Sequence, residues 1–375
     1  YNWLNCLTML SNLANYNASS GNYSEAIHLE TEALNIRKKV LGTEHLVYAT
    51  SLNNLATYNS SLGNYSEAIR LGTDALNIFS KTLGTEHPHY ATTLNNLADY
   101  NASLGNYSEA IRIETMALNI CQKQFGKRHP NYAILLDNLA RYNCYSGNYS
   151  EAAHLSKEVL NIYEKVYGKK HAYYITMLGN SVFYNIAANN LSEVNHDITE
   201  CTNLLSSLIK NTFVNLTAYE RRLFWNRYKI WLENYIHNFA YKIRNDTLSA
   251  NGYNSVLMSK GLLLNSDIEF STLVQESGDE KSMTLYNELR SLRKQIDELH
   301  KKTIAERPVK LDSLERIADD KEHELLRHSK LYGDYTHNLV IDWKQILEKI
   351  DIKDVVVEFV SFSSVKDSIM YIAYI

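Results

Sequence analysis

The chain has 375 residues, of which 45% are apolar and 21% charged, and its formal net charge is −4 at pH 7. This length is enough for two or three domains, and the balanced charge without a basic block argues against nucleic acid or an anionic membrane as partner. No apolar stretch approaches the ~20 residues of a membrane helix, and the 4 scattered cysteines lack a C-x-x-C pair, which favours reduced thiols in the cytoplasm.

A pattern with a period of 42 residues starts at the N-terminus. The hexapeptide GNYSEA begins at Gly21, Gly63, Gly105 and Gly147, and a degenerate copy, NNLSEV, begins at Asn189. A fixed period of this size predicts a solenoid, in which each repeat contacts its neighbours and the stack shares one core. Because Tyr1 already lies inside the pattern, we expect the natural protein to begin further upstream.

Each repeat is predicted to contain two helices, called helix A and helix B below. In the second repeat, helix A is expected over residues 46–62, where Leu52, Leu55 and Ala56 lie on one helical face. Gly63 then supplies a left-handed position, and Asn64 caps helix B in a capping box with Glu67.

Helix B of the second repeat is expected to end at Gly84, and Pro88 to begin the next helix A, where its missing N–H costs little. Gly72 lies in the middle of helix B and is predicted to weaken that helix by about 1 kcal/mol relative to Ala.

The segment ATSLNNLATYNSSLGNYSEAIRLGTDALNIFSKTLGTEHP resembles a tetratricopeptide repeat (TPR) of the 42-residue type found in kinesin light chains. The resemblance covers roughly residues 1–195 and implies an all-α superhelical solenoid. At the position where the family packs an aromatic ring between helices A and B, this chain has Asn17, Asn59, Asn101, Asn143 and Asn185. If these amides are buried, each needs a hydrogen-bond partner, which we expect in the next repeat.

The resemblance also implies that helix A lines a concave groove holding an extended or helical peptide of a partner protein. The asparagine that the family places in this groove matches Asn12, Asn54, Asn96, Asn138 and Asn180, accompanied by Asn53 and Asn95. An amide both donates and accepts, so a ladder of amides can pair with a peptide backbone without reading its sequence.

Specificity is expected from positions one turn away, which differ between repeats: Asn15, Thr57, Asp99 and Arg141. Because the groove positions are mostly Asn, Thr and Ser rather than Lys and Arg, we do not expect recognition of a carboxylate terminus. The alternative is that the asparagine ladder only ties neighbouring repeats together.

Several motifs resemble chemical sites, but their spacing favours structural roles. HELLRH places His323 and His328 five residues apart, about 140° around a helix, so the two rings do not share the face that a zinc site needs. The four histidines at the repeat joints are interpreted as turn packing, the NYS sequons coincide with the helix caps, and Cys144 is expected to be a buried thiol. The sequence therefore indicates no catalytic residue, no metal ligand and no cofactor.

From about residue 191 the period is lost, but helical patterns continue. The next segment has a capping box at Thr217 and Glu220 and an aromatic face expected to cap the open end of the solenoid, formed by Phe224, Trp225, Tyr228 and Trp231. A turn is predicted at Asn251 and Gly252, followed by another helix.

Two segments of alternating charge, 280–303 and 310–331, predict a solvated helix pair, and DWKQILEKI predicts a short helix. The β-branched runs 354–362 and 368–375 predict a hairpin. A lone hairpin is marginal in water, so it must pack on other elements or belong to a larger sheet.

Residues 215–375 also resemble TPR–CHAT proteins, through SVLMSKGLLL, the charged helix pair and IDWKQILEKIDIKDVVVEFVSF. CHAT is a caspase-like cysteine protease family, and the resemblance implies that the hairpin opens an α/β domain whose catalytic His and Cys lie beyond Ile375. The expected domains are a TPR solenoid (1–195), a helical linker (196–350) and the truncated start of a CHAT domain (351–375).

The expected function is binding of a protein or peptide that regulates a protease, in a protein of bacterial origin. A non-enzymatic TPR adaptor is the alternative, and self-assembly through solenoid ends or hairpin edges is a third possibility.

Overall fold

The computed structural model describes residues 2–213, 216, 218–243, 246–264, 279–300, 311–328, 344, 357–363 and 369–374. The chain forms two compact units, residues 1–194 and residues 195–375. Each unit has a hydrophobic cluster of its own.

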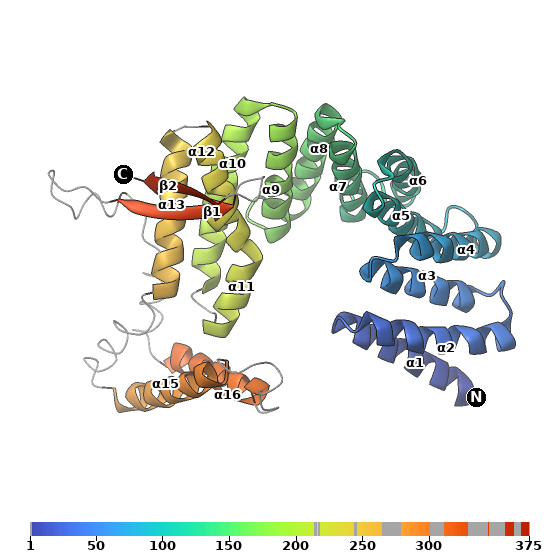
Figure 1. Ribbon diagram of the computed structural model, residues 1–375, viewed down its shortest axis with the longest axis horizontal. Helices are drawn as coiled ribbons and strands as arrows, with labels where there is room; N and C mark the ends of the chain where they lie inside the picture. The colour runs from blue at the N-terminus through green and yellow to red at the C-terminus, as the bar shows by residue number, and fades with distance from the viewer. Residues whose placement is uncertain are drawn as a thin grey trace. The chain divides into compact units, whose positions relative to one another are not determined.

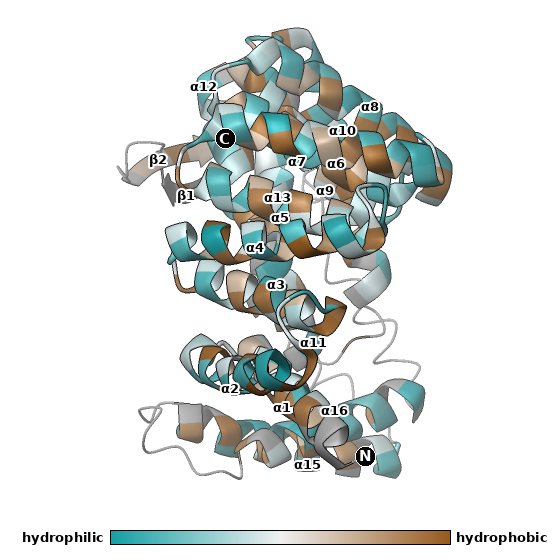
Figure 2. Ribbon diagram, turned by 90° about the vertical axis from the view of Figure 1, so that its right-hand side faces the viewer, coloured by the Kyte–Doolittle hydropathy of each residue, from teal (hydrophilic) through white to brown (hydrophobic). Residues whose placement is uncertain are grey.

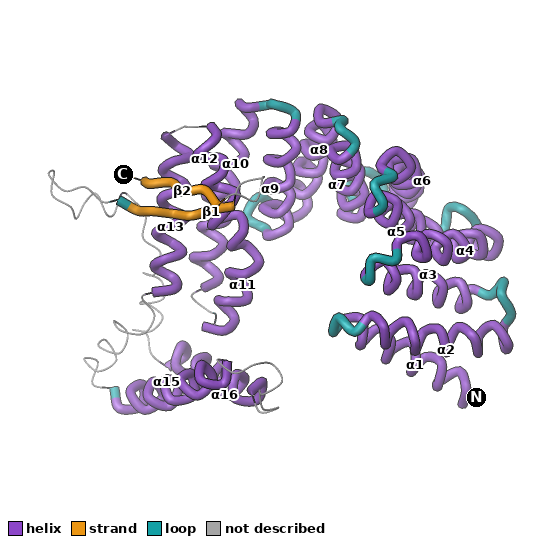
Figure 3. Tube along the Cα trace, in the orientation of Figure 1, coloured by secondary structure: helices purple, strands orange, loops and turns teal. Residues whose placement is uncertain are grey.

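The first unit is a solenoid of helix pairs that follow one another in chain order (Figures 1 and 3). Helix A of successive repeats is α1 (Asn2–Ser19), α3 (Leu46–Ser61), α5 (Pro88–Ser103), α7 (Pro130–Tyr145) and α9 (Ala172–Ala187). Helix B is α2 (Tyr23–Leu41), α4 (Tyr65–Leu83), α6 (Tyr107–Phe125) and α8 (Tyr149–Tyr167). From α1 to α9, each helix packs against the helix before it and the helix after it. The predicted all-helical repeat stack is therefore confirmed.

Glycines set both turns of each repeat, as predicted. Gly63 follows helix A with φ of 82°, and Gly84 follows helix B with φ of 83°, conformations that side chains with a Cβ disfavour. Pro88 is the first residue of α5. In the degenerate fifth repeat Asn189 occupies the first of these turn positions with φ of 59°, which asparagine tolerates better than most residues.

Small residues allow close packing in the solenoid core. Ala56, Ala68 and Ala75 are fully buried, and a Cβ added to Gly72 would lie 2.9 Å from Cδ2 of Leu97 in the next repeat. Gly72 therefore has a packing role besides its low helix propensity. Hydrophobic and hydrophilic residues alternate along α3, α4 and α5 (Figure 2). No described helix has the length and apolar character needed to cross a membrane.

The predicted capping box is wrong in its side-chain contacts. Asn64 is the residue before α4, but its side chain does not cap the helix. Its amide instead donates to Oδ1 of Asn59 at 3.4 Å, and the Glu67 carboxylate accepts two hydrogen bonds from Arg70. Glu67 is therefore held by a residue of the next helical turn, away from the cap.

The expectation that the buried asparagines pair with the next repeat is also wrong, because each is satisfied within its own repeat. Asn59 donates to the Leu55 carbonyl oxygen at 2.9 Å, and Asn101 and Asn143 donate to the equivalent carbonyl four residues earlier. Since Oδ1 of Asn59 accepts from Asn64, this amide joins the end of helix A to the start of helix B in place of an aromatic ring.

The second unit is mainly helical. Its described elements are α10 (Leu191–Phe213, shared with the first unit), α11 (Ala218–Ile230), η1 (Trp231–Tyr235), α12 (Ile236–Ile243), α13 (Asp246–Leu264), α15 (Glu280–His300), α16 (Leu311–His328), β1 (Glu358–Ser363) and β2 (Ile369–Tyr374). As predicted, Trp225, Tyr228 and Trp231 are buried, while Phe224 is half-buried and its ring contacts that of Tyr228 at a tilted angle. The predicted cap at Thr217 and most of DWKQILEKI lie outside the described residues.

The charged segments form the predicted pair, α15 and α16. One face of each is buried around Leu289 and Leu325, so the pair has an apolar seam beneath its solvated surface. Arg293 and Glu322 pair at 2.6 Å beside that seam.

The hairpin is an antiparallel pair of strands, β1 and β2, and it packs on the helices of the second unit. Tyr374 hydrogen-bonds to Nδ1 of His237 in α12 at 2.7 Å. The predicted turn at Asn251 and Gly252 is wrong, because α13 runs through both residues. A Cβ on Gly252 would lie 2.7 Å from Cζ of Tyr374, so the glycine makes room for this ring in the middle of a helix.

Candidate peptide-binding face of the repeats

The predicted groove residues all lie on helix A of successive repeats, and we call the surface they share the ladder face. Asn12, Asn15 and Thr57 are exposed on it, and the other predicted positions are half-buried: Asn53, Asn54, Asn95, Asn96, Asp99, Asn138, Arg141 and Asn180. Half-buried amides and charges at a solvent boundary can contact a ligand, but their existing partners decide how free they are.

Most of the ladder amides already bond to the preceding repeat. Asn138 donates to Oδ1 of Asn95 at 2.9 Å, and Asn180 donates to Asp137 at 3.2 Å. Asn96 and Asn53 make the same contact at a longer 3.5 Å. The alternative role of the ladder, tying repeats together, therefore has direct contacts in the third, fourth and fifth repeats.

The first two ladder amides differ from the others. Within the described part of the chain, the side chains of Asn12 and Asn54 make no hydrogen bond to protein. They are the ladder positions at which an amide can bond to a peptide backbone without breaking a contact inside the solenoid.

A second series of bonds runs along the tyrosines that follow each specificity position. Tyr58 donates to Asn15 at 2.7 Å, Thr57 and Tyr100 share a bond of 3.1 Å, and Tyr142 donates to Asp99 at 3.4 Å. Burial raises the pKa of Tyr58 to about 12, which keeps this phenol a donor. Asn15, Thr57 and Asp99 are thus each held by a tyrosine of the next repeat.

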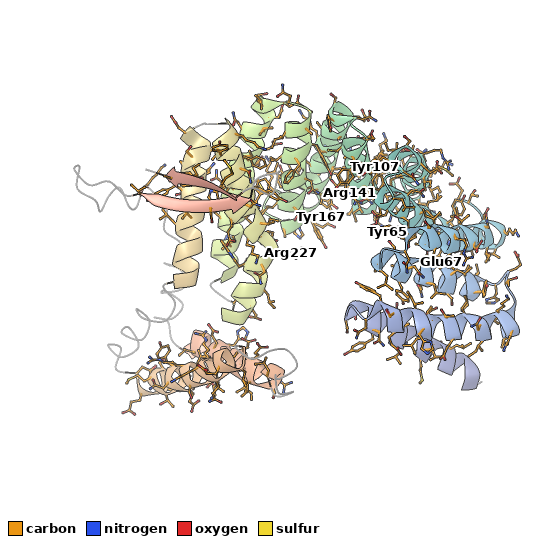
Figure 4. All side chains as sticks on the ribbon, in the orientation of Figure 1. Tyr65, Glu67, Tyr107, Arg141, Tyr167 and Arg227 are labelled. Atoms are coloured by element: carbon orange, nitrogen blue, oxygen red, sulfur yellow. The ribbon has the colours of Figure 1, made fainter. Side chains whose placement is uncertain are left out.

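Charge gathers at the third and fourth repeats. Arg141 of α7, labelled in Figure 4, donates to Asp99 at 3.0 Å and to Asn138 at 3.1 Å. Beside it, burial raises the pKa of Asp137 to about 6 and that of Glu114 to about 8, against the lowering effect of Arg141. The sequence pattern of a single repeat does not identify Glu114 or Asp137, because their burial depends on the neighbouring repeat.

Three of the joint histidines pack against aromatic rings at the turns, as the sequence predicts, and all four also cap the following helix. The ring Nδ1 of His45, His87, His129 and His171 accepts the backbone N–H two residues later, at 3.1 to 3.2 Å, before α3, α5, α7 and α9. His323 pairs with Glu220 at 3.4 Å, and no group of three or more His, Cys, Asp or Glu side chains suited to a metal occurs in the described ranges. The prediction that Cys144 is a buried thiol is wrong, because this residue lies at the end of α7 and is half-buried, whereas Cys121 and Cys201 are buried.

The stacked helix pairs, the glycine turns and the shared core define the class of fold: the first unit is a solenoid with the architecture of tetratricopeptide repeats. Residues 5–81, 67–123 and 115–165 match the sequence family described as tetratricopeptide repeat. No curated protein matches the chain. The resemblance of residues 215–375 to CHAT proteins stays a prediction.

Three solved structures illustrate the likeness. One is the structure of the nearly identical TPR-like repeats of a kinesin light chain from Podospora anserina. Its sequence is 24% identical to this chain, with a TM-score of 0.50, and the match covers 54% of this chain and 95% of that chain. A point variant of those repeats gives the same values. BtubC (BKLC) from P. vanneervenii is 20% identical, with a TM-score of 0.49, over 53% of this chain and 79% of that chain. At this identity the first likeness shows the fold alone.

Proposed function

We propose that the repeats bind a segment of a partner protein along the ladder face. The observation that carries this proposal is the pair of unengaged amides at Asn12 and Asn54, set in line with amides that are engaged. A partner backbone bonding to Asn54 would continue a series of contacts that the solenoid makes with itself further along.

We further propose that the chain is the regulatory part of a caspase-like cysteine peptidase of the CHAT type, located in the cytoplasm. The resemblance of residues 215–375 supports the protease assignment, and the buried thiols of Cys121 and Cys201 are consistent with a reducing compartment. Partner binding to the repeats would then control peptide hydrolysis by the Cys–His pair of such a peptidase. A TPR adaptor without enzymatic activity is the alternative function.

The test separates ligand contact from repeat packing. Peptides are selected on the protein from a random display library, and their affinities are measured for Asn54→Ala and Asn138→Ala. We expect Asn54→Ala to weaken binding with unchanged helicity and thermal stability, because its amide has no partner in the solenoid. Asn138→Ala serves as the packing control, since its amide bonds to Asn95 and Glu114 and its loss should lower stability.

Unchanged affinity in Asn54→Ala would contradict a role for the ladder in binding. The protease assignment is tested separately, by assaying the natural full-length protein for partner-dependent peptidase activity that a thiol-directed inhibitor abolishes. Partner binding without any such activity favours the adaptor.

A further inference from the structure

A hollow of about 220 Å³ opens between α5, α6 and α7 in the third repeat. Ala91, Asn95, Cys121 and Leu135 are among its lining residues, none of which carries a charged side chain. The other repeats show why space is left here.

In the other repeats, large side chains occupy the position of Cys121. One period of 42 residues earlier stands Phe79, one later stands Tyr163, and two earlier stands Arg37, all of them buried. Each of these repeats fills the space with its own side chain. The third repeat has only a thiol there, and the hollow is the volume that the thiol does not fill.

The first repeat shows what fits this space with polar contacts. Arg37 donates to Glu30 at 2.9 Å, to the Leu7 carbonyl oxygen at 3.2 Å and to Ser11 at 2.9 Å, and it also donates to Ser51. Two repeats later, the residues equivalent to the last three partners all line the hollow: Ala91, Asn95 and Leu135. The hollow therefore coincides with the guanidinium site of the first repeat.

The third repeat also has the acidic residue that pairs with the arginine in the first repeat. The position of Glu30 holds Gly72 in the repeat with Phe79 and Ser156 in the repeat with Tyr163, but it holds Glu114 in the repeat with Cys121. A carboxyl thus accompanies the arginine in the first repeat, and the third repeat has the carboxyl without the arginine.

Glu114 is fully buried and receives one hydrogen bond, from Asn138 at 3.3 Å. Among the described residues its Oε2 has no hydrogen-bond partner, as is also true of Oε2 in Glu30, but Glu30 has a guanidinium on its other oxygen. Asn138 also donates to Asn95 at 2.9 Å, so one amide joins Glu114 to the wall of the hollow. A buried carboxylate without a bonded cation is costly, and a cation from outside would relieve that cost.

We propose that the third repeat binds an arginine side chain of a partner polypeptide, with its guanidinium where Arg37 lies in the first repeat and its charge paired with Glu114. The carbonyl oxygen of Ala91 and Oδ1 of Asn95 are the further acceptors, and the planar, multi-donor guanidinium suits such a set better than an ammonium group. The inference rests on the proposed function, because it names the partner chemistry that the repeats recognise.

The first test uses a small probe. N-acetylarginine amide is titrated into the isotopically labelled protein. The NMR signals of the side-chain amides of Asn95 and of Gln124, which also lines the hollow, are followed. We expect saturable shifts confined to the hollow, and at least about tenfold weaker binding of the uncharged citrulline analogue, since bonds to a charged group are lost. Equal binding of the two, or tighter binding of N-acetylphenylalanine amide as a mimic of Phe79, would overturn the proposal.

The second test fills the site from within. Cys121→Arg should raise the thermal unfolding temperature and abolish probe binding, and Glu114→Gln should remove both the gain and the binding. Cys121→Ser is the matched control, because it leaves the hollow open and should bind as the wild type does. Should Cys121→Arg not fold, Cys121→Phe copies the second repeat and blocks the same space. Probe binding that survives a folded blocking variant, or that survives Glu114→Gln, contradicts the proposal.

The pH dependence gives a third readout. Burial raises the pKa of Glu114 to about 8, Arg141 of α7 lowers it and Asp99 of α5 raises it. The titratable group of Tyr142, also on α7, interacts with the same carboxyl. Because the cation pairs with the ionised carboxyl, affinity should rise as the pH increases towards 8 and be flat in Glu114→Gln. Asn54→Ala leaves the hollow unchanged and so separates the two proposals. If this variant binds the arginine probe and also binds the library peptides with unaltered affinity, peptide binding by the ladder face is refuted and the arginine site in the third repeat is not.

Discussion

His87 shows how one side chain of the repeat joint fixes the start of a helix. Its Nδ1 accepts the backbone N–H of His89 at 3.1 Å, a bond that serines and aspartates usually make at helix N-termini. The ring also stacks on that of His89 at 5.1 Å between centroids, so the residue combines a cap with an aromatic contact. A histidine at this position therefore ends one repeat and begins the next.

We predict that His87→Ala destabilises the first turn of α5 by about 1 kcal/mol, the usual cost of losing a cap. The His89 amide should then exchange its hydrogen about fivefold faster, which hydrogen-exchange NMR can measure at that single residue. His87→Asn is the control, because its side-chain oxygen can accept the same N–H. Equal acceleration in both variants would show that the ring contact, and not the cap, protects this turn.

Among the elements, the two turns of each repeat use glycine in different ways. Gly63 and Gly84 both have positive φ, but Gly84 has ψ of 164°, in a region almost confined to glycine. The degenerate fifth repeat has Asn189 at the position of Gly63. The first turn therefore accepts asparagine in place of glycine in one repeat, whereas no repeat shows such a replacement at the second turn.

We predict that Gly84→Asn lowers the free energy of unfolding of the first unit by about 1–3 kcal/mol, whereas Gly63→Asn costs less than about 1 kcal/mol. No atom lies within 4 Å of a Cβ built on either glycine, so the difference comes from the backbone and not from a clash. Differential scanning calorimetry of the two variants makes the comparison. A larger loss in Gly63→Asn would contradict this assignment of the turns.

The helices and turns of the repeats could be predicted from the sequence because their signals are local and recur every 42 residues. The partner of Asn59 was predicted wrongly, since an amide can bond to the carbonyl four residues earlier as readily as to a neighbouring repeat. The helical conformation of Gly252 could not be predicted from its local sequence, because the ring it accommodates belongs to Tyr374. At the candidate site, Glu114 did leave a signal, which emerges only when the repeats are aligned on Arg37 and Cys121.

At the scale of the whole molecule, the two units carry buried groups that respond to pH in opposite directions. Burial raises the pKa of Glu114 from 4.5 to about 8 and that of Asp137 from 3.8 to about 6 in the first unit. Burial lowers the pKa of His237 from 6.5 to about 4 in the second unit, where its ring bonds to Tyr374. These shifts fix the sign of each unit's stability change.

In the first unit, the folded state keeps protons that the unfolded chain has released, between pH 3.8 and 6 for Asp137 and between pH 4.5 and 8 for Glu114. Its stability should therefore fall as pH rises through those windows. In the second unit, His237 of the unfolded chain is protonated below pH 6.5, whereas His237 of the folded chain is not protonated until about pH 4. That unit should lose stability as pH falls through this window.

We therefore predict two calorimetric transitions that move in opposite directions between about pH 5 and 6.5, the window in which both linkages act. The transition of the first unit should shift to lower temperature with rising pH, and that of the second unit to higher temperature. Glu114→Gln should flatten the first slope and leave the second, while His237→Gln should do the reverse, whatever either substitution does to absolute stability. A single transition, or two slopes of the same sign, would mean that the units unfold together or that other groups govern their response to pH.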